Sequence, residues 1–449
     1  MAVHSMLPSP RSSVWSNQTH ADAIVIGSGP GGATVARGLA QAGWRVLILE
    51  RGQDQRRHPT YGTYLGALRY AERGSLLYSH EGMQIIRPLL LGGATSMYCG
   101  CAAPPPDWFA TRYGIDLSQE VADSMEELGV APLPPPLRGA ASTKIALAAT
   151  QLGMDWQPQA KLMSPGRAAQ FTCGAHCMLG CRCGAKWNAA SFVDQAVAAG
   201  AILQTGVHVH NLIREGRRVV GVAGYRHGRF FRATADHVIL AAGGIGSPRI
   251  LAASGIPAGE GLTVDTTLMV YGFAPEGGIG REPPMTWVWH HPEDAFMLST
   301  LVDPWLMYPL AIAQADLGQI GSWANWSNLH GVMIKIKDSV AGTVGQRSIS
   351  KPATTHDRAI ISEAERIARQ ILVAAGADRQ RLITTPLRGT HPASTVRIGH
   401  LVDSDLHSEW AGLYVCDASI FPEALARPTV LTIIGFGKRL VQQLTSGRR

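Results

Sequence analysis

The sequence predicts an α/β protein that combines a Rossmann-like nucleotide-binding domain with a second, discontinuous domain. Three observations lead to this prediction. An apolar run at 23–26 leads through a glycine turn into an Ala-rich helical stretch and then into a second apolar run at 46–49. Alternating strand and helix patterns return at 200–246 and at 389–444. The intervening residues 257–384 are rich in tryptophan and are typical of strands with one packed face.

The glycine turn explains why the first domain is expected to bind a dinucleotide. Gly27 permits a tight turn, Gly29 lets the backbone approach a pyrophosphate, and Gly32 lets the helix pack closely on the strands. Glu50 ends the second strand about 20 residues further on, where a carboxylate accepts hydrogen bonds from a ribose. The alternative is a glycine turn with a purely structural role, but the strand, turn, helix and acid together favour a bound dinucleotide.

Composition excludes several classes of protein. The chain has 449 residues, of which 46% are hydrophobic and 16% charged, and this suits two or three globular cores. The net charge of +7 is scattered and forms no basic block with interleaved aromatics, so nucleic acid is not an expected partner. Residues 1–21 are expected to form a flexible leader, and residues 1–20 lack the apolar stretch that a secretion signal needs. The sequence contains no run of about 18 apolar residues, so no membrane span is predicted. A cytoplasmic location is expected.

Two segments between the nucleotide motifs deserve separate interpretation. A glycine pair, Gly92 and Gly93, follows an apolar run and could bring backbone amides to a ligand, although such pairs are more often simple turns. Proline clusters at 104–106 and 132–136 surround a helical pattern at 115–128 and indicate a domain boundary.

Four cysteines lie within eleven residues, followed by a helical run at 189–199: Cys173, Cys177, Cys181 and Cys183. Their spacing lacks the paired CxxC knuckles of a zinc site. An iron–sulfur cluster is chemically feasible, because such clusters need close thiolates. Buried packing cysteines are the commoner explanation, and a functional disulfide is the least favoured one.

Later segments predict further strands and helices. A strand at 238–241 leads into small residues and a helix that begins at Ser247–Pro248. A helix is expected at 360–377, and a strand ending at Asp417 supplies another small-residue edge. Five tryptophans are expected to belong mainly to a packed strand face, with some lining an apolar substrate pocket: Trp287, Trp289, Trp305, Trp323 and Trp326.

Together these stretches resemble the glucose–methanol–choline (GMC) family of FAD-dependent oxidoreductases. The motifs occur in the family's order: GSGPGG with Glu50, GGATSMY at 92–98, the cysteine segment, VILAAGGIGSPRIL from Val238, and the C-terminal HPASTVRIG and GLYVCDASIFP. The resemblance implies a Rossmann-like FAD-binding domain at 22–101, 200–256 and 387–449. It also implies a substrate domain with a mainly antiparallel sheet and helices at 102–199 and 257–386.

The resemblance also implies functional residues. His391 stands at the family's catalytic histidine, which takes the hydroxyl proton of an alcohol; on local sequence alone a lone histidine is more often structural. The family's second His or Asn is absent from Ala426–Arg427–Pro428–Thr429, and Arg427 is the candidate replacement, able to bind an anion but not to act as a base. The expected FAD-binding residues are Gly27, Gly29, Gly32, Glu50, Arg51, Gly92, Gly93, Ser96, Val209, Ala242, Asp417, Ala418 and Thr429.

Three functions follow from these features. The favoured one is an FAD-dependent dehydrogenase or oxidase that acts on an alcohol group of a small, fairly apolar molecule, such as an intermediate of secondary metabolism. The missing second His or Asn leaves open a flavin-containing relative with net non-redox, lyase-type chemistry. An electron-relay flavoprotein is the third, and it would need a second redox centre such as an iron–sulfur cluster at the cysteine segment. The electron acceptor is left open. The chain is also shorter than is common in the family, which implies a more open site.

Overall fold

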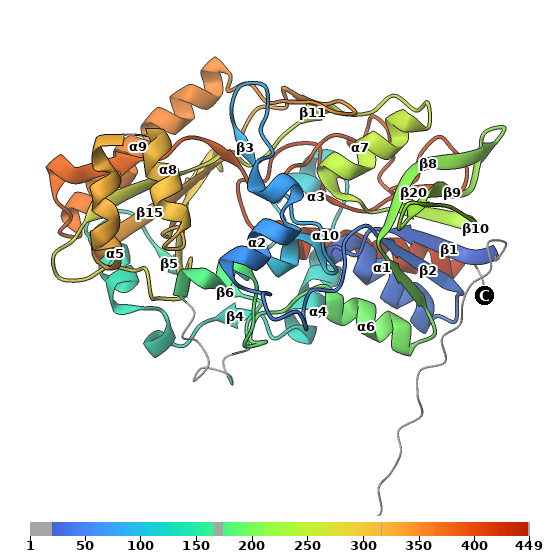
Figure 1. Ribbon diagram of the computed structural model, residues 1–449, viewed down its shortest axis with the longest axis horizontal. Coiled ribbons are helices and arrows are strands. Elements are labelled where there is room, and N and C mark those ends of the chain that lie inside the picture. Colours follow the sequence, from blue (N-terminus) through green and yellow to red (C-terminus); the bar gives the residue numbers. More distant parts are fainter. Residues whose placement is uncertain (1–19, 165, 167–173, 316, 448–449) are drawn as a thin grey trace, which may run out of the picture.

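Two large β-sheets lie side by side along the long axis of the molecule, each with its own layer of helices (Figure 1). The computed structural model describes residues 20–447 apart from 165, 167–173 and 316. The predicted mixed α/β class, with one Rossmann-like sheet and one mainly antiparallel sheet, is confirmed.

The first sheet is parallel at its centre, because its neighbouring strands are joined by helical crossovers. The strand order is β7-β2-β1-β10-β9-β8, and a further strand, β20, pairs in parallel with the carboxyl end of β10. β8 and β9 extend the sheet in antiparallel pairing. The strands are β1 (His20–Ile26), β2 (Val46–Glu50), β7 (Ile202–Thr205), β8 (Val207–Glu215), β9 (Arg218–Arg226), β10 (Arg229–Leu240) and β20 (Leu413–Val415).

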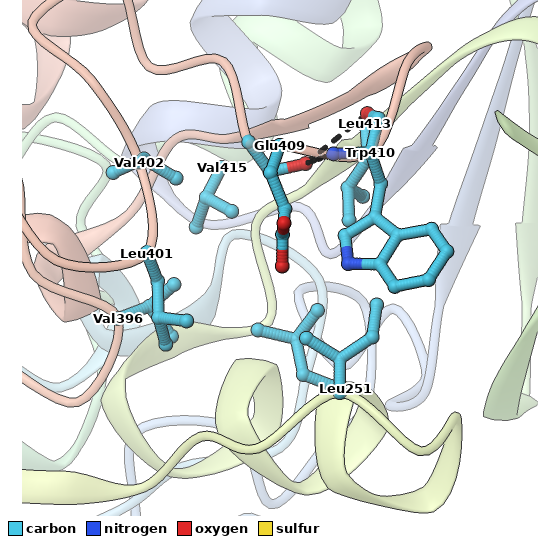
Figure 2. Close-up of a pocket in the computed structure, with 10 residues that line it drawn as sticks. Leu251, Val396, Leu401, Val402, Glu409, Trp410, Leu413 and Val415 are labelled. Carbon is cyan, nitrogen blue, oxygen red and sulfur yellow. Dashed lines mark hydrogen bonds between the residues drawn. The ribbon is translucent and has the colours of Figure 1, made fainter. Parts of the chain in front are cut away.

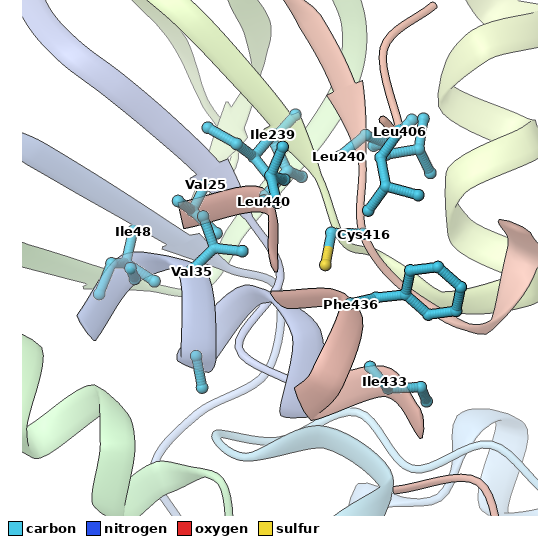
Figure 3. Packing of buried hydrophobic residues seen from close by; sticks show 14 of the residues in the cluster. Val25, Val35, Ile48, Ile239, Leu240, Leu406, Cys416, Ile433, Phe436 and Leu440 are labelled. Carbon is cyan, nitrogen blue, oxygen red and sulfur yellow. The ribbon is translucent and has the colours of Figure 1, made fainter. Parts of the chain in front are cut away.

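Helices cover both faces of this sheet, which explains why its central strands are apolar throughout. Three helices lie on one face, α1 (Pro30–Gln41), α6 (Ala190–Ala198) and α10 (Val430–Ser446), and α7 (Gly243–Ala253) lies on the other (Figure 1). Figure 3 shows Val35 of α1 and Phe436 of α10 in the same buried layer as Val25 of β1 and Ile239 of β10. This packing holds the first and last segments of the chain together.

The second sheet is antiparallel at its centre, in the order β12-β15-β14-β13, and shorter strands extend it at its edges. Helix α9 packs on it together with α5, and α8 lies at its edge. The elements are β3 (Gln84–Ile85), β5 (Gln157–Pro158), β12 (Thr267–Phe273), β13 (Trp287–His290), β14 (Phe296–Thr300), β15 (Leu329–Ile336), β18 (Leu382–Thr384), β19 (Arg388–Gly389), α5 (Ala140–Gln151), α8 (Met307–Ala315) and α9 (Thr355–Ala374).

Short elements connect the two sheets. Helix α4, which lies between the two proline clusters, packs against α10. The remaining elements are α2 (Tyr64–Tyr70), α3 (Trp108–Tyr113), α4 (Ser118–Glu127), β4 (Ala131–Pro132), β6 (Ala160–Lys161), β11 (Glu260–Leu262), β16 (Gly342–Val344) and β17 (Ile349–Ser350). Among the described residues, no helix is both long and apolar enough to cross a membrane.

Several predicted boundaries were wrong. His20 and Ala21 belong to β1, so the predicted leader at 1–21 overlaps the sheet; residues 1–19 lie outside the described residues. Helix α7 begins at Gly243 and contains Pro248 in its interior, because small residues allow the turn to close earlier than Ser247. Helix α9 begins at Thr355, where a capping box of Thr354 and Asp357 satisfies the first free N–H groups.

The tryptophan-rich region is only partly a strand face. Trp287 and Trp289 lie in β13, as predicted, whereas Trp305, Trp323 and Trp326 lie in turns and a 3-10 segment at 317–328. Hydrogen bonding also places β3 and β19 in the second sheet, although the predicted domain boundaries assign 84–85 and 388–389 to the FAD-binding domain. Short edge strands follow tertiary hydrogen bonding rather than local periodicity.

Candidate active site and FAD cradle

The glycine turn after β1 is shaped by contacts that no larger residue would permit. Gly27 has φ +104°, and its N–H donates to the carbonyl of Leu49 at 2.8 Å. A Cβ on Gly27 would overlap the carbonyl oxygen of Ala241, and one on Gly32 would overlap that of Gly27. Both glycines are therefore required by the fold itself, as their positions in the motif predict.

Gly29 differs from its neighbours, because a Cβ there would meet nothing within 4 Å. It stands at the N-cap of α1, where none of the described side chains accepts the free N–H groups of the first helical turn. Gly93 lies against it, since a Cβ on Gly93 would come 3.1 Å from the Gly29 Cα. Open space, free N–H donors and a helix N-terminus match the needs of a pyrophosphate, so these residues fit FAD.

Glu50 joins the end of β2 to the glycine turn through hydrogen bonds. Its buried carboxylate accepts hydrogen bonds from the Ser28 N–H at 3.0 Å, the Ser28 hydroxyl at 2.6 Å and the Gly52 N–H at 2.7 Å. The Ser28 hydroxyl in turn accepts the Gly92 N–H at 3.0 Å. A carboxylate offers about four acceptor positions, so one remains for a ribose hydroxyl. Gly92 itself has φ +86° and joins the second glycine pair to the first turn.

The other carboxyl strand ends of the first sheet meet at the same place. Ala242 follows β10 and caps α7, and its N–H donates to the Ser247 hydroxyl at 3.1 Å. The Asp417 carboxylate accepts the Gly243 N–H at 2.8 Å and the Ser247 hydroxyl at 2.5 Å, and burial raises its pKa. A Cβ on Gly31 would overlap the carbonyl oxygen of Cys416. Ligands of open α/β sheets bind at such an edge.

The remaining expected cofactor residues occupy varied positions. Ser96 is buried, accepts a hydrogen bond from the Asn188 amide at 2.8 Å and donates to the Leu91 carbonyl at 3.2 Å. The Arg51 Nη1 lies 3.7 Å from the Glu72 Oε1. Val209 is a buried residue of β8 and pairs with Gly224 of β9.

Two further expected residues stand at the starts of helical segments. Ala418 begins a 3-10 turn, and Thr429 stands at the N-cap of α10. Their contacts with FAD stay predictions.

His391 lies between the two sheets, in a segment that crosses from one to the other. Its backbone N–H donates to the carbonyl of Val264 at 2.9 Å. Its Nδ1 lies 2.7 Å from the Oδ2 of Asp265, while 28% of its side chain is exposed. This geometry gives the imidazole a fixed partner on one nitrogen and leaves the ring partly open on its other side.

A buried lysine stands close to this pair. The Lys335 ammonium of β15 donates to the hydroxyls of Thr390 at 2.5 Å and Thr267 at 3.1 Å. Burial and the Lys335 charge lower the pKa of His391 from its ordinary value of 6.5, while Asp265 acts in the opposite direction. Burial also lowers the pKa of Lys335. The net effect favours a neutral imidazole, which is the form that accepts a proton.

Arg427 connects the segment after Phe421 to the hairpin between β13 and β14. Its Nη2 donates to Asp294 Oδ1 at 2.6 Å, and its buried Nε has no hydrogen-bond partner among the described residues. Burial and the nearby Arg427 charge lower the pKa of His290 to about 4. The guanidinium is thus held on one side and keeps an unused donor on another.

The cysteine segment lies against Pro283 and Pro284, where a small pocket is lined by Cys177, Cys181 and Cys183. Cys181 and Cys183 have their sulfurs 3.7 Å apart, and burial raises the pKa of Cys181. Within the part of the chain that the structure describes, no group of three or more His, Cys, Asp or Glu side chains is arranged to hold a metal ion. Cys173 lies outside the described residues.

A second small pocket lies between the end of α7 and residues 396–415, and none of the predicted site residues lines it (Figure 2). Four of the five tryptophans that are candidates for lining a substrate pocket make contacts with other protein groups. Trp326 is buried and donates to the Asp303 carbonyl at 2.9 Å, and Trp287 donates to the Thr143 hydroxyl at 3.2 Å. The rings of Trp305 and Trp323 lie 4.6 Å apart. A tryptophan-lined pocket stays a prediction.

Sequence reasoning missed Asp265 and Lys335. Asp265 stands in the run TVDTT with no motif around it, and Lys335 interrupts the apolar run at 332–336. Lys335 alone could have been noticed, because a lysine within a buried strand indicates that a partner lies nearby.

Family models account for most of the chain. The GMC oxidoreductase model of the N-terminal part matches residues 70–281, and the corresponding C-terminal model matches residues 347–437. A model of an FAD-binding domain matches residues 22–65, which include the glycine turn and Glu50.

Curated relatives include an uncharacterized protein of Methanocaldococcus jannaschii, 31% identical over 47% of this chain and 53% of its own length. A long-chain-alcohol oxidase of Arabidopsis thaliana is 26% identical over 92% of this chain and 65% of its own length. An uncharacterized GMC-type oxidoreductase of Mycobacterium tuberculosis is 30% identical over 53% of this chain and 40% of its own length. The chain therefore covers less than two thirds of each of these relatives.

Solved structures share the fold over nearly the whole chain. Pyridoxine 4-oxidase from Mesorbium loti superposes with a TM-score of 0.69 at 17% identity, over 94% of this chain and 98% of its own. A formate oxidase superposes with a TM-score of 0.70 at 14% identity, over 96% of this chain and 99% of its own. At these identities the likeness concerns the fold.

Proposed function

Because the chain belongs to the GMC oxidoreductase family and binds FAD, we propose that it oxidises an alcohol group on a small, fairly apolar molecule, with His391 as the base. The observation that carries this proposal is the His391 imidazole, held by a carboxylate on Nδ1 and kept neutral by burial and a nearby cation. When bound, FAD supplies the hydride acceptor.

The chain's own residues divide the remaining work. The glycine turn and the α1 N-terminus bind the pyrophosphate, and Glu50 binds the ribose. His391 accepts the hydroxyl proton on the nitrogen opposite Asp265. Arg427 supplies a positive charge that stabilises the negative charge growing on the substrate oxygen. A long-chain-alcohol oxidase among the relatives favours primary alcohols with aliphatic chains as first candidates.

Anaerobic mixing of the purified flavoprotein with a series of primary alcohols of increasing chain length tests the proposal. We expect at least one alcohol to bleach the absorbance of the oxidised flavin. Lyase-type chemistry would consume substrate without lasting bleaching, and failure of every alcohol tested to reduce the flavin would contradict the proposal. The same reduced enzyme, mixed with oxygen or with a dye acceptor, then distinguishes an oxidase from a dehydrogenase.

Replacing Lys335 with methionine is expected to shift the pH profile of flavin reduction to higher pH. A base works when neutral, so the rate rises with pH through the pKa of His391, which burial and Lys335 depress below 6.5 and Asp265 opposes. Removing the cation raises this pKa, and the rising limb moves to higher pH. Stopped-flow reduction between pH 5 and 9 measures the limb. Lys337→Met is the matched control, because Lys337 pairs with Glu423; an unmoved limb in Lys335→Met would contradict the assignment.

Replacing Arg427 with alanine is expected to slow flavin reduction about 10- to 100-fold, since a hydrogen bond to a charged group contributes about 1.5–3 kcal/mol. Arg427→Lys should retain part of the rate. The control Asp294→Asn breaks the ion pair but leaves the guanidinium, so it should preserve the rate. If Arg427→Ala and Asp294→Asn lower thermal stability equally and neither changes the rate of flavin reduction, Arg427 serves only to join the two segments.

A further inference from the structure

The Asp265 carboxylate is shared by two segments that are far apart in the sequence. Its Oδ2 lies 2.7 Å from His391 Nδ1, and its Oδ1 accepts the backbone N–H of Ala426 at 3.0 Å. Ala426 immediately precedes Arg427, and it has φ +51°. One buried side chain therefore holds both the proposed base and the turn that presents Arg427.

We propose that Asp265 is the positioning residue of this site: it holds the proton of His391 on Nδ1, so that Nε2 is the basic nitrogen, and it fixes the Ala426–Arg427 turn with its second oxygen. The inference rests on the proposed function, since it assigns a positioning residue to the base named there. It adds a residue that no sequence motif marks.

The chemistry of the carboxylate decides which nitrogen of His391 carries the proton. In a neutral imidazole one nitrogen donates and the other accepts, and an ionised carboxylate only accepts. Facing Asp265, Nδ1 must therefore be the donor. The Ala426 N–H is also a donor, so both oxygens of Asp265 are used as acceptors. The acceptor nitrogen of His391 is then Nε2.

The backbone of Asp265 is held as firmly as its side chain. Asp265 has φ +47°, a left-handed conformation that costs a non-glycine residue free energy and persists where neighbours enforce it. Its carbonyl accepts the Thr267 hydroxyl at 2.8 Å and the Thr390 hydroxyl at 3.4 Å, and the Lys335 ammonium contacts both threonines. The neighbouring residues 263 and 264 pair with 390–393, which brings His391 to the carboxylate.

Asp265→Asn is the decisive variant, because an amide keeps the shape and has a single acceptor oxygen. If that oxygen stays on the Ala426 N–H, the amide NH2 faces Nδ1 and forces the histidine proton onto Nε2. Uniformly 15N-histidine-labelled protein, recorded by long-range 1H–15N correlation at neutral pH, reports the tautomer. The His391 signals are assigned by their loss in His391→Gln.

The wild-type protein should show His391 protonated on Nδ1, and Asp265→Asn should show it protonated on Nε2. Flavin reduction by a competent alcohol should fall about 10²–10⁴-fold, the usual contribution of a general base. Asp357→Asn is the matched control: this buried aspartate also accepts backbone N–H groups, at the start of α9, and its loss should lower thermal stability without changing the tautomer or the rate.

An unchanged His391 tautomer in a folded Asp265→Asn protein would overturn the proposal, as would a wild-type histidine protonated on Nε2. The spectra need no substrate, so they test Asp265 even if no alcohol reduces the flavin. Failure of the proposed function would leave the tautomer result intact, whereas failure of the positioning proposal would leave alcohol oxidation intact.

Discussion

Replacing His391 with alanine is expected to leave FAD bound and to slow flavin reduction by an alcohol about 10²–10⁴-fold, because the variant loses its general base. Flavin should remain bound because the glycine turn, Glu50 and the α1 N-terminus are unchanged. The fold should also persist, since 28% of the His391 side chain is exposed. Stopped-flow absorbance of the flavin under anaerobic conditions measures the rate.

His400→Ala is the control for this experiment, because His400 lies in the same segment and is exposed. It should reduce at the wild-type rate. A His391→Ala enzyme that binds FAD and is reduced as fast as wild type would remove His391 from the mechanism. An enzyme that has lost its flavin would instead indicate a structural role for this histidine.

Alanine at Gly27 and alanine at Gly29 should have opposite consequences, although the two residues are neighbours in one motif. Gly27→Ala places a side chain at φ +104° and against the Ala241 carbonyl, so the free energy of unfolding of the apoprotein should fall by about 3–5 kcal/mol. Gly29→Ala meets only open space, and its cost as a weaker N-cap is at most about 1 kcal/mol.

The affinity for FAD should be lowered in Gly29→Ala, although the stability of this variant is nearly unchanged. In Gly29→Ala the methyl group enters the space where the pyrophosphate is expected, and each lost charge-assisted hydrogen bond costs about 1.5–3 kcal/mol, or roughly 10- to 100-fold in affinity. Urea unfolding of the apoprotein and fluorescence titration with FAD measure the two quantities. A Gly29→Ala protein that is stable and binds FAD normally would show that the pyrophosphate lies elsewhere.

The sequence anticipated the Rossmann-like part well because its signals are local. The order of strand, glycine turn, helix and acid within residues 22–52 needs no distant contact to be recognised, and the roles expected of Gly27 and Gly32 agree with their backbone contacts. Boundaries that depend on packing were less accurate: α7 begins four residues before the expected Ser247, and three tryptophans lie outside strands.

Some residues of the candidate site could be predicted from the sequence, and others are identified only by the tertiary structure. Local pattern alone favoured a structural role for His391, and its candidacy as the base came from resemblance to a family. Its partner Asp265 lies 126 residues earlier, in a run without a motif. What brings them together is backbone pairing of 263–264 with 390–393, and Lys335 is added by the register of β15. Periodicity cannot specify such pairing, because many registers satisfy the same apolar pattern.

By itself, therefore, the sequence determined that this chain builds a glycine-lined dinucleotide cradle, since tight turns and close approaches demand particular residues at particular spacings. Only the tertiary structure decided which carboxylate holds His391 and which cation lowers its pKa. The physical reason is that a hydrogen bond extends over about 3 Å and depends on direction, so its partner is chosen by the final packing of segments that are distant in the chain.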